Sequence, residues 1–417
     1  MEKRNPWTWI PSLYFAEGLP YVTVMTLSVI MYKRFNVSNT DIALLTSWLY
    51  FPWVIKPIWS PFVELIKTKR WWIYSMQLLI GGGMAGAAFV LPGDSFLRFS
   101  LMFFWLLAFS SATHDIAADG FYMLDLDKKQ QAFFIGIRNT FYRAAMLTGQ
   151  GLLVMLAGFI ENKTGRIPLA WSLIFFIMAG SFIAFSLWHR YILPYPSSDK
   201  CREGITARMI ISEFGRMFIS FFQKKGIVPA LLFMLTYRLG ESQLVKLASP
   251  FLLDSRDVGG LGLSTARVGF TYGTVGVVSL LLGGVLGGFV ISKDGLKKWI
   301  WPMALAISLP NMVYMYMAYV MPENIYVVNS CVAIEQFGYG FGFTAYTVYL
   351  MFFSEGEYKT SHYAIGTGFM ALGMMLPGMV SGWIQELVGY QHFFIWVMIC
   401  CIPSFLVLPF LRFKESE

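Results

Sequence analysis

Charged residues are scarce in this sequence. Only 13% of its 417 residues are Asp, Glu, Lys or Arg, whereas 56% are hydrophobic and the mean hydropathy is +0.57. A soluble globular domain carries about 25% charged residues, so the composition excludes a soluble enzyme or regulatory domain. The chain is long enough to cross a bilayer many times, and we expect a multi-pass membrane protein.

Cysteine is also rare. The four cysteines, Cys201, Cys331, Cys400 and Cys401, have no spacing typical of metal ligands and form no disulfide framework. We therefore expect no metal site and no cofactor. The opening stretch MEKRNPWTWIP leads directly into an apolar segment without a small-residue cleavage site, which predicts that no signal peptide is removed.

Long apolar stretches dominate the rest of the chain. Windows of about 20 apolar residues, each long enough to cross a bilayer as a helix, can be placed twelve times. The predicted spans are 9–32, 41–64, 73–91, 99–124, 133–160, 169–188, 229–253, 265–292, 298–320, 325–353, 362–388 and 391–411. The only long polar connection divides them, so we predict an N-terminal six-helix bundle (1–188), a cytoplasmic linker (189–228) and a C-terminal six-helix bundle (229–417).

Lysine and arginine are unequally divided between the two sets of loops. With the N-terminus in the cytoplasm, 20 of the 32 lie on the cytoplasmic side and 7 on the other side, which is the positive-inside pattern. Both termini are therefore predicted to be cytoplasmic. The net charge of +8 has this origin, so we expect no nucleic-acid partner. In the linker, the apolar residues from 210 to 221 share one helix face, which predicts an amphipathic helix in the membrane interface.

Two features recur about 230 residues apart, which indicates an internal repeat. Glu64 and Asp294 each end a span and are followed by basic residues, and KQQAFFIG (129–136) and KTSHYAIG (359–366) each begin one. Duplicated six-helix units are how major facilitator transporters are built. The repeat therefore predicts an all-α fold of two pseudo-symmetric six-helix bundles, and it argues against an enzyme, which has no need for matched halves.

Ionisable side chains inside the spans are the main functional signal. Each costs about 2.5–3.5 kcal/mol at the centre of a bilayer on insertion scales, so each is expected to face a cavity or a partner. The set contains five acids and five bases, which allows only a modest bias toward an anionic substrate. Its members are Glu17, Lys56, Asp115, Asp119, Arg138, Arg143, Arg238, Glu241, Lys246 and Glu335.

Asp115 and Asp119 are four residues apart and so share one face of a helix. Two nearby carboxylates repel each other unless a cation lies between them or one keeps its proton. We expect Arg143 to be the nearest cation, followed by Arg138 or Lys56. The aspartates then either form structural ion pairs or carry protons, and both roles are compatible in a pair that breaks and reforms.

Other candidate residues leave alternatives open. His114 is either a pH sensor or a fixed hydrogen-bond donor, or with its neighbouring aspartate the base of a membrane acyltransferase. Arg238 and Glu241 either pair with each other or hold a substrate. Tyr14 and Tyr142 either stack on a sugar ring or pack in the core. The small-residue stretches GGVLGG (283–288) and FGYGFG (337–342) predict close helix contacts.

Several motifs in order resemble the muropeptide permeases (AmpG type) and the related acetyl-CoA transporters of the major facilitator superfamily, over nearly the whole chain. They are GLP (18–20), KPIWSPFVE (56–64), SATHDIAADG (111–120), YRAAML (142–147), YRLGES (237–242), the glycines that follow Glu335, and PGMVSGWIQELVGYQHFF (377–394). Two positions depart from the family pattern, because His114 replaces a Gln and Glu17 stands where a small residue is common.

The resemblance implies a proton-coupled importer of N-acetylglucosaminyl-1,6-anhydro-N-acetylmuramyl peptides in a bacterial inner membrane, acting as a monomer. A siderophore carrier or an acyl-CoA or nucleotide-linked carrier of the same fold is the alternative. We predict proton coupling by Glu17, Asp115, Asp119 and Glu335. We predict substrate binding by Lys56, Arg138, Arg143, Arg238, Glu241, Tyr142 and Tyr14.

Overall fold

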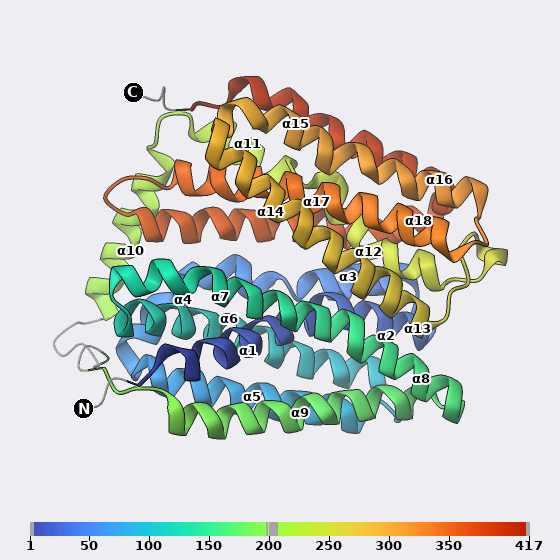
Figure 1. Cartoon of the computed structure of the whole chain (residues 1–417), viewed down its shortest axis with the longest axis horizontal. Coiled ribbons are helices and arrows are strands. Elements are labelled where there is room, and N and C mark those ends of the chain that lie inside the picture. Colours follow the sequence, from blue (N-terminus) through green and yellow to red (C-terminus); the bar gives the residue numbers. More distant parts are fainter. Residues whose placement is uncertain (1–3, 197–198, 200–206, 414–417) are drawn as a thin grey trace. The chain divides into compact units, whose positions relative to one another are not determined.

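The computed structural model describes residues 4–196, 199 and 207–413, which form helices and loops without any strand (Figure 1). Cys201 and the side chains of Glu64 and Ile210, which entered the sequence predictions, lie outside the described part. The apolar composition thus gives an all-α fold, as predicted.

Helices of the N-terminal half follow the first six predicted spans. Their bounds are η1 (Pro6–Thr8), α1 (Ile10–Val22), η2 (Thr23–Leu27), α2 (Ser28–Arg34), α3 (Asn39–Trp48), α4 (Phe51–Ile66), α5 (Lys69–Val90), α6 (Phe96–Asp125), α7 (Lys128–Met146), η3 (Leu147–Leu153), α8 (Val154–Thr164) and α9 (Ile167–Ile192). The linker forms α10 (Ala207–Phe222), which agrees with the predicted helix there.

Helices of the C-terminal half follow the other six spans. They are α11 (Ile227–Thr236), α12 (Leu239–Leu253), η4 (Arg256–Val258), α13 (Thr265–Val268), η5 (Gly269–Gly276), α14 (Val277–Asp294), α15 (Leu296–Ser308), η6 (Leu309–Asn311), α16 (Met312–Val320), α17 (Ile325–Phe353), α18 (Lys359–Val407) and η7 (Leu408–Phe410).

Eight helices of the described part could cross a membrane by length and apolar composition alone, or nine if one pair bent by 95° counts as a span. Twelve spans nevertheless fit. The segment Lys359–Phe410 counts once although its 52 residues would extend about 78 Å as one helix, far beyond a hydrocarbon core of about 30 Å. Its backbone turns at Gly389, with φ 73° and ψ 167°, a conformation essentially restricted to glycine. The other predicted spans lie on broken or more polar helices.

The chain forms two compact units that do not follow chain order throughout. One comprises residues 1–31 and 55–211, and the other comprises 32–54 and 212–417. Segment 32–54 joins the second unit because α3 packs against α18 and α12 there. The predicted division at residues 188 and 228 stays a prediction, and the structure differs from it by placing this segment with the C-terminal helices.

In the first unit, α5 packs against both α6 and α9, and α1 packs along α7 (Figure 1). Gly18 allows the contact of α1 with α7, because a Cβ at this position would come within 2.7 Å of the Tyr142 carbonyl oxygen. A buried aromatic and aliphatic core that includes Trp9, Tyr14 and Phe121 fixes these helices. The close approach of α1 and α7 brings Glu17 and Tyr142 into one region.

In the second unit, α17 packs against α14 and α15, and α18 packs against α11 and α12. The pairing of α12 with α18 matches that of α1 with α7, since both join the first and fifth spans of their halves. Backbones of α14 and α17 touch at glycines: a Cβ at Gly283 would overlap the Phe337 carbonyl, and one at Gly340 would overlap the Leu280 carbonyl. The close contact predicted for these stretches is confirmed.

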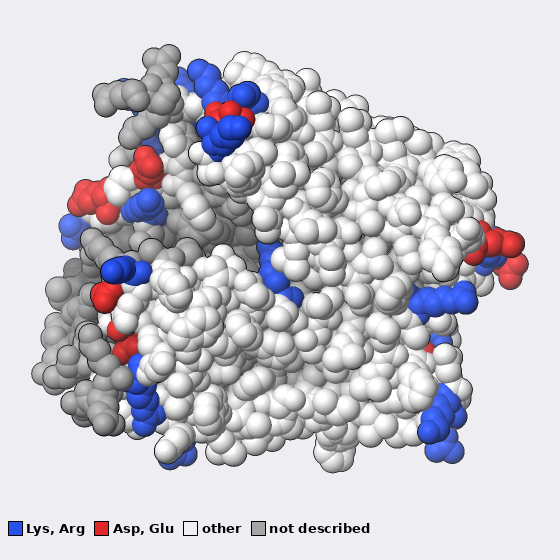
Figure 2. Space-filling view, in the orientation of Figure 1, with Lys and Arg blue, Asp and Glu red and all other residues white. Residues whose placement is uncertain are grey.

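Charged side chains are unevenly distributed over the visible surface. On the face shown in Figure 2, the lysines, arginines and acids lie mostly toward the ends of the helices, and the surface over the middle of the helices is almost entirely uncharged. Large apolar side chains such as Phe89, Val285 and Leu387 are more than two thirds exposed. An apolar helical surface of this kind is suited to contact with lipid.

Candidate functional site

Asp119 on α6 is the centre of a charged cluster in the first unit. Arg138 on α7 places Nη2 2.8 Å from Asp119 Oδ1, and Tyr14 on α1 donates its hydroxyl to the same oxygen at 3.3 Å. The Arg138 guanidinium also lies over the rings of Tyr14 and Tyr122, 4.5 and 5.5 Å from their centroids. Three helices thus hold one ion pair, whose two side chains keep 26% and 38% of their exposure.

A second ion pair lies one helical turn away. Lys56 on α4 places Nζ 3.6 Å from Asp115 Oδ2. The sequence expectation that Arg143 would be the first cation for these aspartates is wrong, since the ion pairs go to Lys56 and Arg138. Arg143 instead places Nη1 3.7 Å from Met146 Sδ. The reason is the register of α7, because Arg138 and Arg143 are five residues apart and so point in different directions.

Glu17 on α1 is buried beside both pairs. Its side chain is 7% exposed and its Oε2 has no hydrogen-bond partner among the described residues. The acids Asp119 and Asp115 and the bases Arg138 and Lys56 act on it electrostatically. A buried carboxyl oxygen without a partner costs about 1–3 kcal/mol. Such a group is retained at a functional site more readily than in a structural core.

Tyr142 and Arg143, both predicted to bind substrate, lie half-buried on α7 next to this cluster. The backbone of Tyr142 packs on Gly18. Tyr14, by contrast, is fully buried, and its hydroxyl is engaged by Asp119. In this conformation Tyr14 therefore orients the ion pair and its ring is not open to a ligand.

In the second unit the predicted site residues are buried more deeply. Glu241 on α12 and Glu335 on α17 are 3% and 2% exposed and influence each other electrostatically. Gln336 donates its amide to both oxygens of Glu335, at 3.3 and 3.0 Å. Oε2 of Glu241 has no partner in the part of the chain that the structure describes. The two acids thus form a buried carboxyl pair with few donors.

Arg238 lies in the turn between α11 and α12. It donates to the hydroxyl of Tyr339 on α17 and stacks on the rings of Tyr339 and Phe343, 5.2 and 4.8 Å from their centroids. Arginine prefers such planar stacking because its guanidinium is flat and delocalised. Arg238 also acts electrostatically on Glu241, so both predicted roles of this pair stay predictions.

A polar network, which we call the latch, ties segment 32–54 to α12 and α18. Lys33 pairs with Asp254 at 2.7 Å, and Asn39 donates to Gln385 at 2.6 Å and to Tyr390 at 2.9 Å. Three further bonds complete it: Tyr390 to Asp254 at 2.6 Å, Thr40 to Glu386 at 2.6 Å and Lys246 to Thr46 at 2.9 Å. The sequence analysis missed the latch, because its residues are scattered and look like ordinary helix-end polar groups.

A second buried histidine, His189, was missing from the sequence predictions. His189 near the end of α9 was not considered, yet it is fully buried and bonded to Gln77, which in turn bonds to His114. The rarity of histidine, with four in the chain, was the available signal. The neighbouring Asp115 carries an ion pair with Lys56, so it does not orient His114 as it would in a catalytic base.

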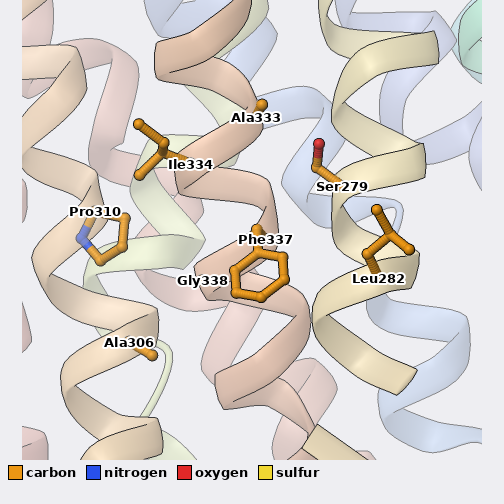
Figure 3. Close-up of a pocket in the computed structure, with 8 residues that line it drawn as sticks. All are labelled: Ser279, Leu282, Ala306, Pro310, Ala333, Ile334, Phe337 and Gly338. Atoms are coloured by element: carbon orange, nitrogen blue, oxygen red, sulfur yellow. The ribbon is translucent and has the colours of Figure 1, made fainter. Parts of the chain in front are cut away.

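Two cavities lie apart from these groups. One of 380 Å³, in the second unit, is lined almost entirely by apolar side chains of α14, α15 and α17, including Leu282, Ile334 and Phe337 (Figure 3). Another of 680 Å³, in the first unit, lies beside Phe89 and Arg166. Neither contains a predicted site residue. Among the described residues, no group of His, Cys, Asp and Glu is arranged to hold a metal ion.

The helices are arranged in the major facilitator fold, and ionisable groups lie inside its apolar helices. The chain superimposes on the crystal structure of a D-xylose-proton symporter with a TM-score of 0.73 and 12% identity, covering 98% of this chain and 96% of that one. This likeness shows the fold, and it confirms the predicted fold class.

Sequence relatives carry matching names. The chain is 25% identical to the putative transporter AmpG 4 of Rickettsia conorii, covering 97% of this chain and 96% of the relative. It is 24% identical to the anhydromuropeptide permease of Escherichia coli K12, covering 95% of this chain and 77% of the relative. No family model matches the chain. The resemblance to AmpG-type permeases is confirmed, and the names of the relatives agree with a transporter and not an enzyme.

Proposed function

We propose that this protein imports N-acetylglucosaminyl-1,6-anhydro-N-acetylmuramic acid, with or without its peptide, together with protons by alternating access. We place it as a monomer in a bacterial inner membrane with both termini in the cytoplasm. The similarity to an anhydromuropeptide permease supports the substrate class. The carboxylate of the muramic acid, or in the peptide-linked forms a carboxylate of the peptide, provides an anion for the arginines and lysines inside the spans.

The observation that carries the proposal is the pairing of Asp119 with Arg138 beside the unpartnered oxygen of Glu17. Two unit charges 4 Å apart attract by about 4 kcal/mol at an effective dielectric constant of 20, so neither partner leaves the other without compensation. A substrate carboxylate that takes Arg138 leaves Asp119 charged and alone. A proton that neutralises Asp119 leaves Arg138 alone. Arriving together, substrate and proton satisfy both groups.

Roles for the other residues follow from this exchange. Glu17 accepts the proton first or passes it on, because it lies beside Asp119 with a free carboxyl oxygen. Lys56 and Asp115 repeat the same exchange one turn away. Tyr142 and Arg143 line the approach along α7. In the second unit, Arg238 and Glu241 contact the sugar and peptide, and the Glu241–Glu335 pair holds a further proton.

The latch supports alternating access. It joins the end of α2 and part of α3 to helices of the C-terminal half through exchangeable hydrogen bonds and one ion pair. Each such bond contributes about 0.5–1.5 kcal/mol net, so the set can hold one state and still open on the time scale of transport. The latch opens when that side of the protein becomes accessible.

Uptake by right-side-out membrane vesicles tests the proposal. Vesicles with the wild-type protein should accumulate labelled anhydro-disaccharide, and a protonophore should abolish the accumulation. Asp94→Asn, an exposed acid in a loop, is the matched control for Asp119→Asn and should transport normally. No accumulation by the wild type contradicts the substrate, and uptake of a siderophore or an acyl-CoA instead would identify the alternative carrier. Accumulation that survives the protonophore contradicts the coupling.

A further inference from the structure

Four helices of the first unit are joined by one chain of buried polar side chains. Gln77 on α5 lies between two histidines, with its Nε2 2.9 Å from Nε2 of His114 on α6 and its Oε1 2.9 Å from Nδ1 of His189 on α9. Nε2 of His189 lies 2.9 Å from Oγ of Ser12 on α1. Gln77, His114 and His189 are 0%, 1% and 0% exposed, so these three side chains are closed to bulk water, and Ser12 is half-buried.

Only two hydrogen-bond arrangements of this chain give every one of its three contacts a donor and an acceptor. They differ in the orientation of the Gln77 amide. An amide offers one acceptor and one donor group, and a neutral imidazole offers one of each. In the first arrangement Gln77 donates to His114 and accepts from Nδ1–H of His189, and Ser12 donates to His189. In the second the amide is turned over: His114 donates to Gln77, Gln77 donates to His189, and His189 donates to Ser12.

Ser12 can serve both arrangements. When its oxygen accepts from His189, its own proton can go to the carbonyl oxygen of Trp9, which lies 3.2 Å away. Turning the amide therefore swaps the tautomer of His189 and redirects the Ser12 hydroxyl without leaving a new unpaired group at that end. Ser12 lies on the same helix as Tyr14 and Glu17.

His114 determines which arrangement holds. A protonated histidine is a donor at both nitrogens, so charged His114 is compatible with the second arrangement alone. Its other nitrogen, Nδ1, is buried without a partner among the described residues. The charged group that acts on His114 is Lys56 of α4, which is paired with the adjacent Asp115. The other titratable group is His189 of α9, which lies beyond Gln77. Because Gln77 has a single acceptor, His114 and His189 cannot both donate to it.

We propose that His114, Gln77, His189 and Ser12 form a proton-sensing chain, in which protonation of His114 beside the Lys56–Asp115 pair turns the Gln77 amide and switches the tautomer of His189 against α1. Gln77 and His189 are positioning residues in this chain. The chain passes the protonation state of α6 to the helix that carries Tyr14 and Glu17. Its role in coupling rests on the proposed function, but the switch itself does not require transport.

Nitrogen NMR of the full-length protein, labelled with ¹⁵N-histidine and reconstituted in lipid, tests the switch directly. The shifts of the two ring nitrogens distinguish both tautomers and the cation, and single His→Gln variants assign the four histidines. Between about pH 8 and 5, the range in which an unperturbed histidine changes charge, His114 should become charged. His189 should change from Nδ1–H to Nε2–H with the same midpoint and remain neutral.

Two variants separate the switch from simple damage. Gln77→Leu should remove the link, so that the His189 tautomer no longer follows His114. Gln77→Glu supplies two acceptor oxygens and a negative charge, so both histidines should take up protons, with midpoints raised by about one pH unit or more. Unchanged signals of His362, which lies in the second unit, report that each variant is folded.

Four results would overturn the proposal. They are a neutral His114 over the whole range, a His189 tautomer that stays fixed while His114 titrates, simultaneous charging of both histidines in the wild type, and a His189 switch that persists in Gln77→Leu. Failure of vesicles to take up the anhydro-disaccharide would contradict the proposed function alone and leave the NMR result intact.

Discussion

At the scale of single residues, the account depends on charges that each have a partner they can exchange. Asp119 binds Arg138, and Asp115 binds Lys56. Glu17 keeps an oxygen without a partner. A partly buried ion pair of this kind adds little net stability, because the cost of removing both charges from water offsets most of their attraction. Such pairs are better explained as switches. The proposed coupling uses this property, since proton and substrate replace the two halves of one pair.

Asp119→Asn tests the exchange at this scale. It leaves Arg138 without its carboxylate, so we expect a loss of about 1–3 kcal/mol in the free energy of unfolding, seen as a lower Tm. Uptake should fall at least tenfold. The double variant Asp119→Asn with Arg138→Gln removes both charges and should recover the Tm without recovering uptake. Recovered uptake in the double variant would show that the pair is purely structural.

At the scale of helices, much could be predicted from sequence. The twelve apolar windows fall almost entirely on helix, because a long apolar stretch can satisfy its own backbone groups inside a bilayer only as a helix. The helix register that puts Asp115 and Asp119 on one face was also predictable. The partner cations were not, because Arg138 and Arg143 are both on α7 and only packing decides which one meets α6. The latch could not be predicted at all, since most of its contacts join residues 200 or more positions apart.

Gly382→Ala tests the latch. A Cβ at Gly382 would overlap the carbonyl of Asn39, so α3 must move away from α18. In a background without native cysteines, the pair Thr40→Cys and Glu386→Cys should cross-link readily, and Gly382→Ala should lower the yield several-fold. Gly180→Ala on α9 is the control, because a Cβ there meets nothing within 4 Å. An unchanged yield in Gly382→Ala would show that this contact does not hold the latch.

At the scale of the whole molecule, the two halves share a plan that the sequence repeat indicates. The equivalent pairings of α1 with α7 and of α12 with α18 bear this out. The packing of residues 32–54 with the C-terminal helices was not predictable. A sequence repeat predicts the helices of each bundle, but it does not predict that a segment of the N-terminal half packs with the C-terminal helices. In the proposed alternating access, the contacts of residues 32–54 with α12 and α18 must break and form again.

The orientation of the whole chain is open to a direct test. Asp94 and Glu357 are exposed loop residues on opposite sides of the predicted topology. In intact cells, a membrane-impermeant maleimide should label Asp94→Cys and leave Glu357→Cys unlabelled until the membrane is opened. Labelling of Glu357→Cys alone would reverse the predicted orientation.

The central claim is that anhydro-disaccharide and proton move together. Purified protein in proteoliposomes, with a pH indicator on one side and no imposed gradient, should move protons in the same direction as the disaccharide when the disaccharide is added. The proton signal should vanish with Asp119→Asn and persist with Asp94→Asn. Disaccharide entry without any proton signal in the wild-type protein would contradict the account.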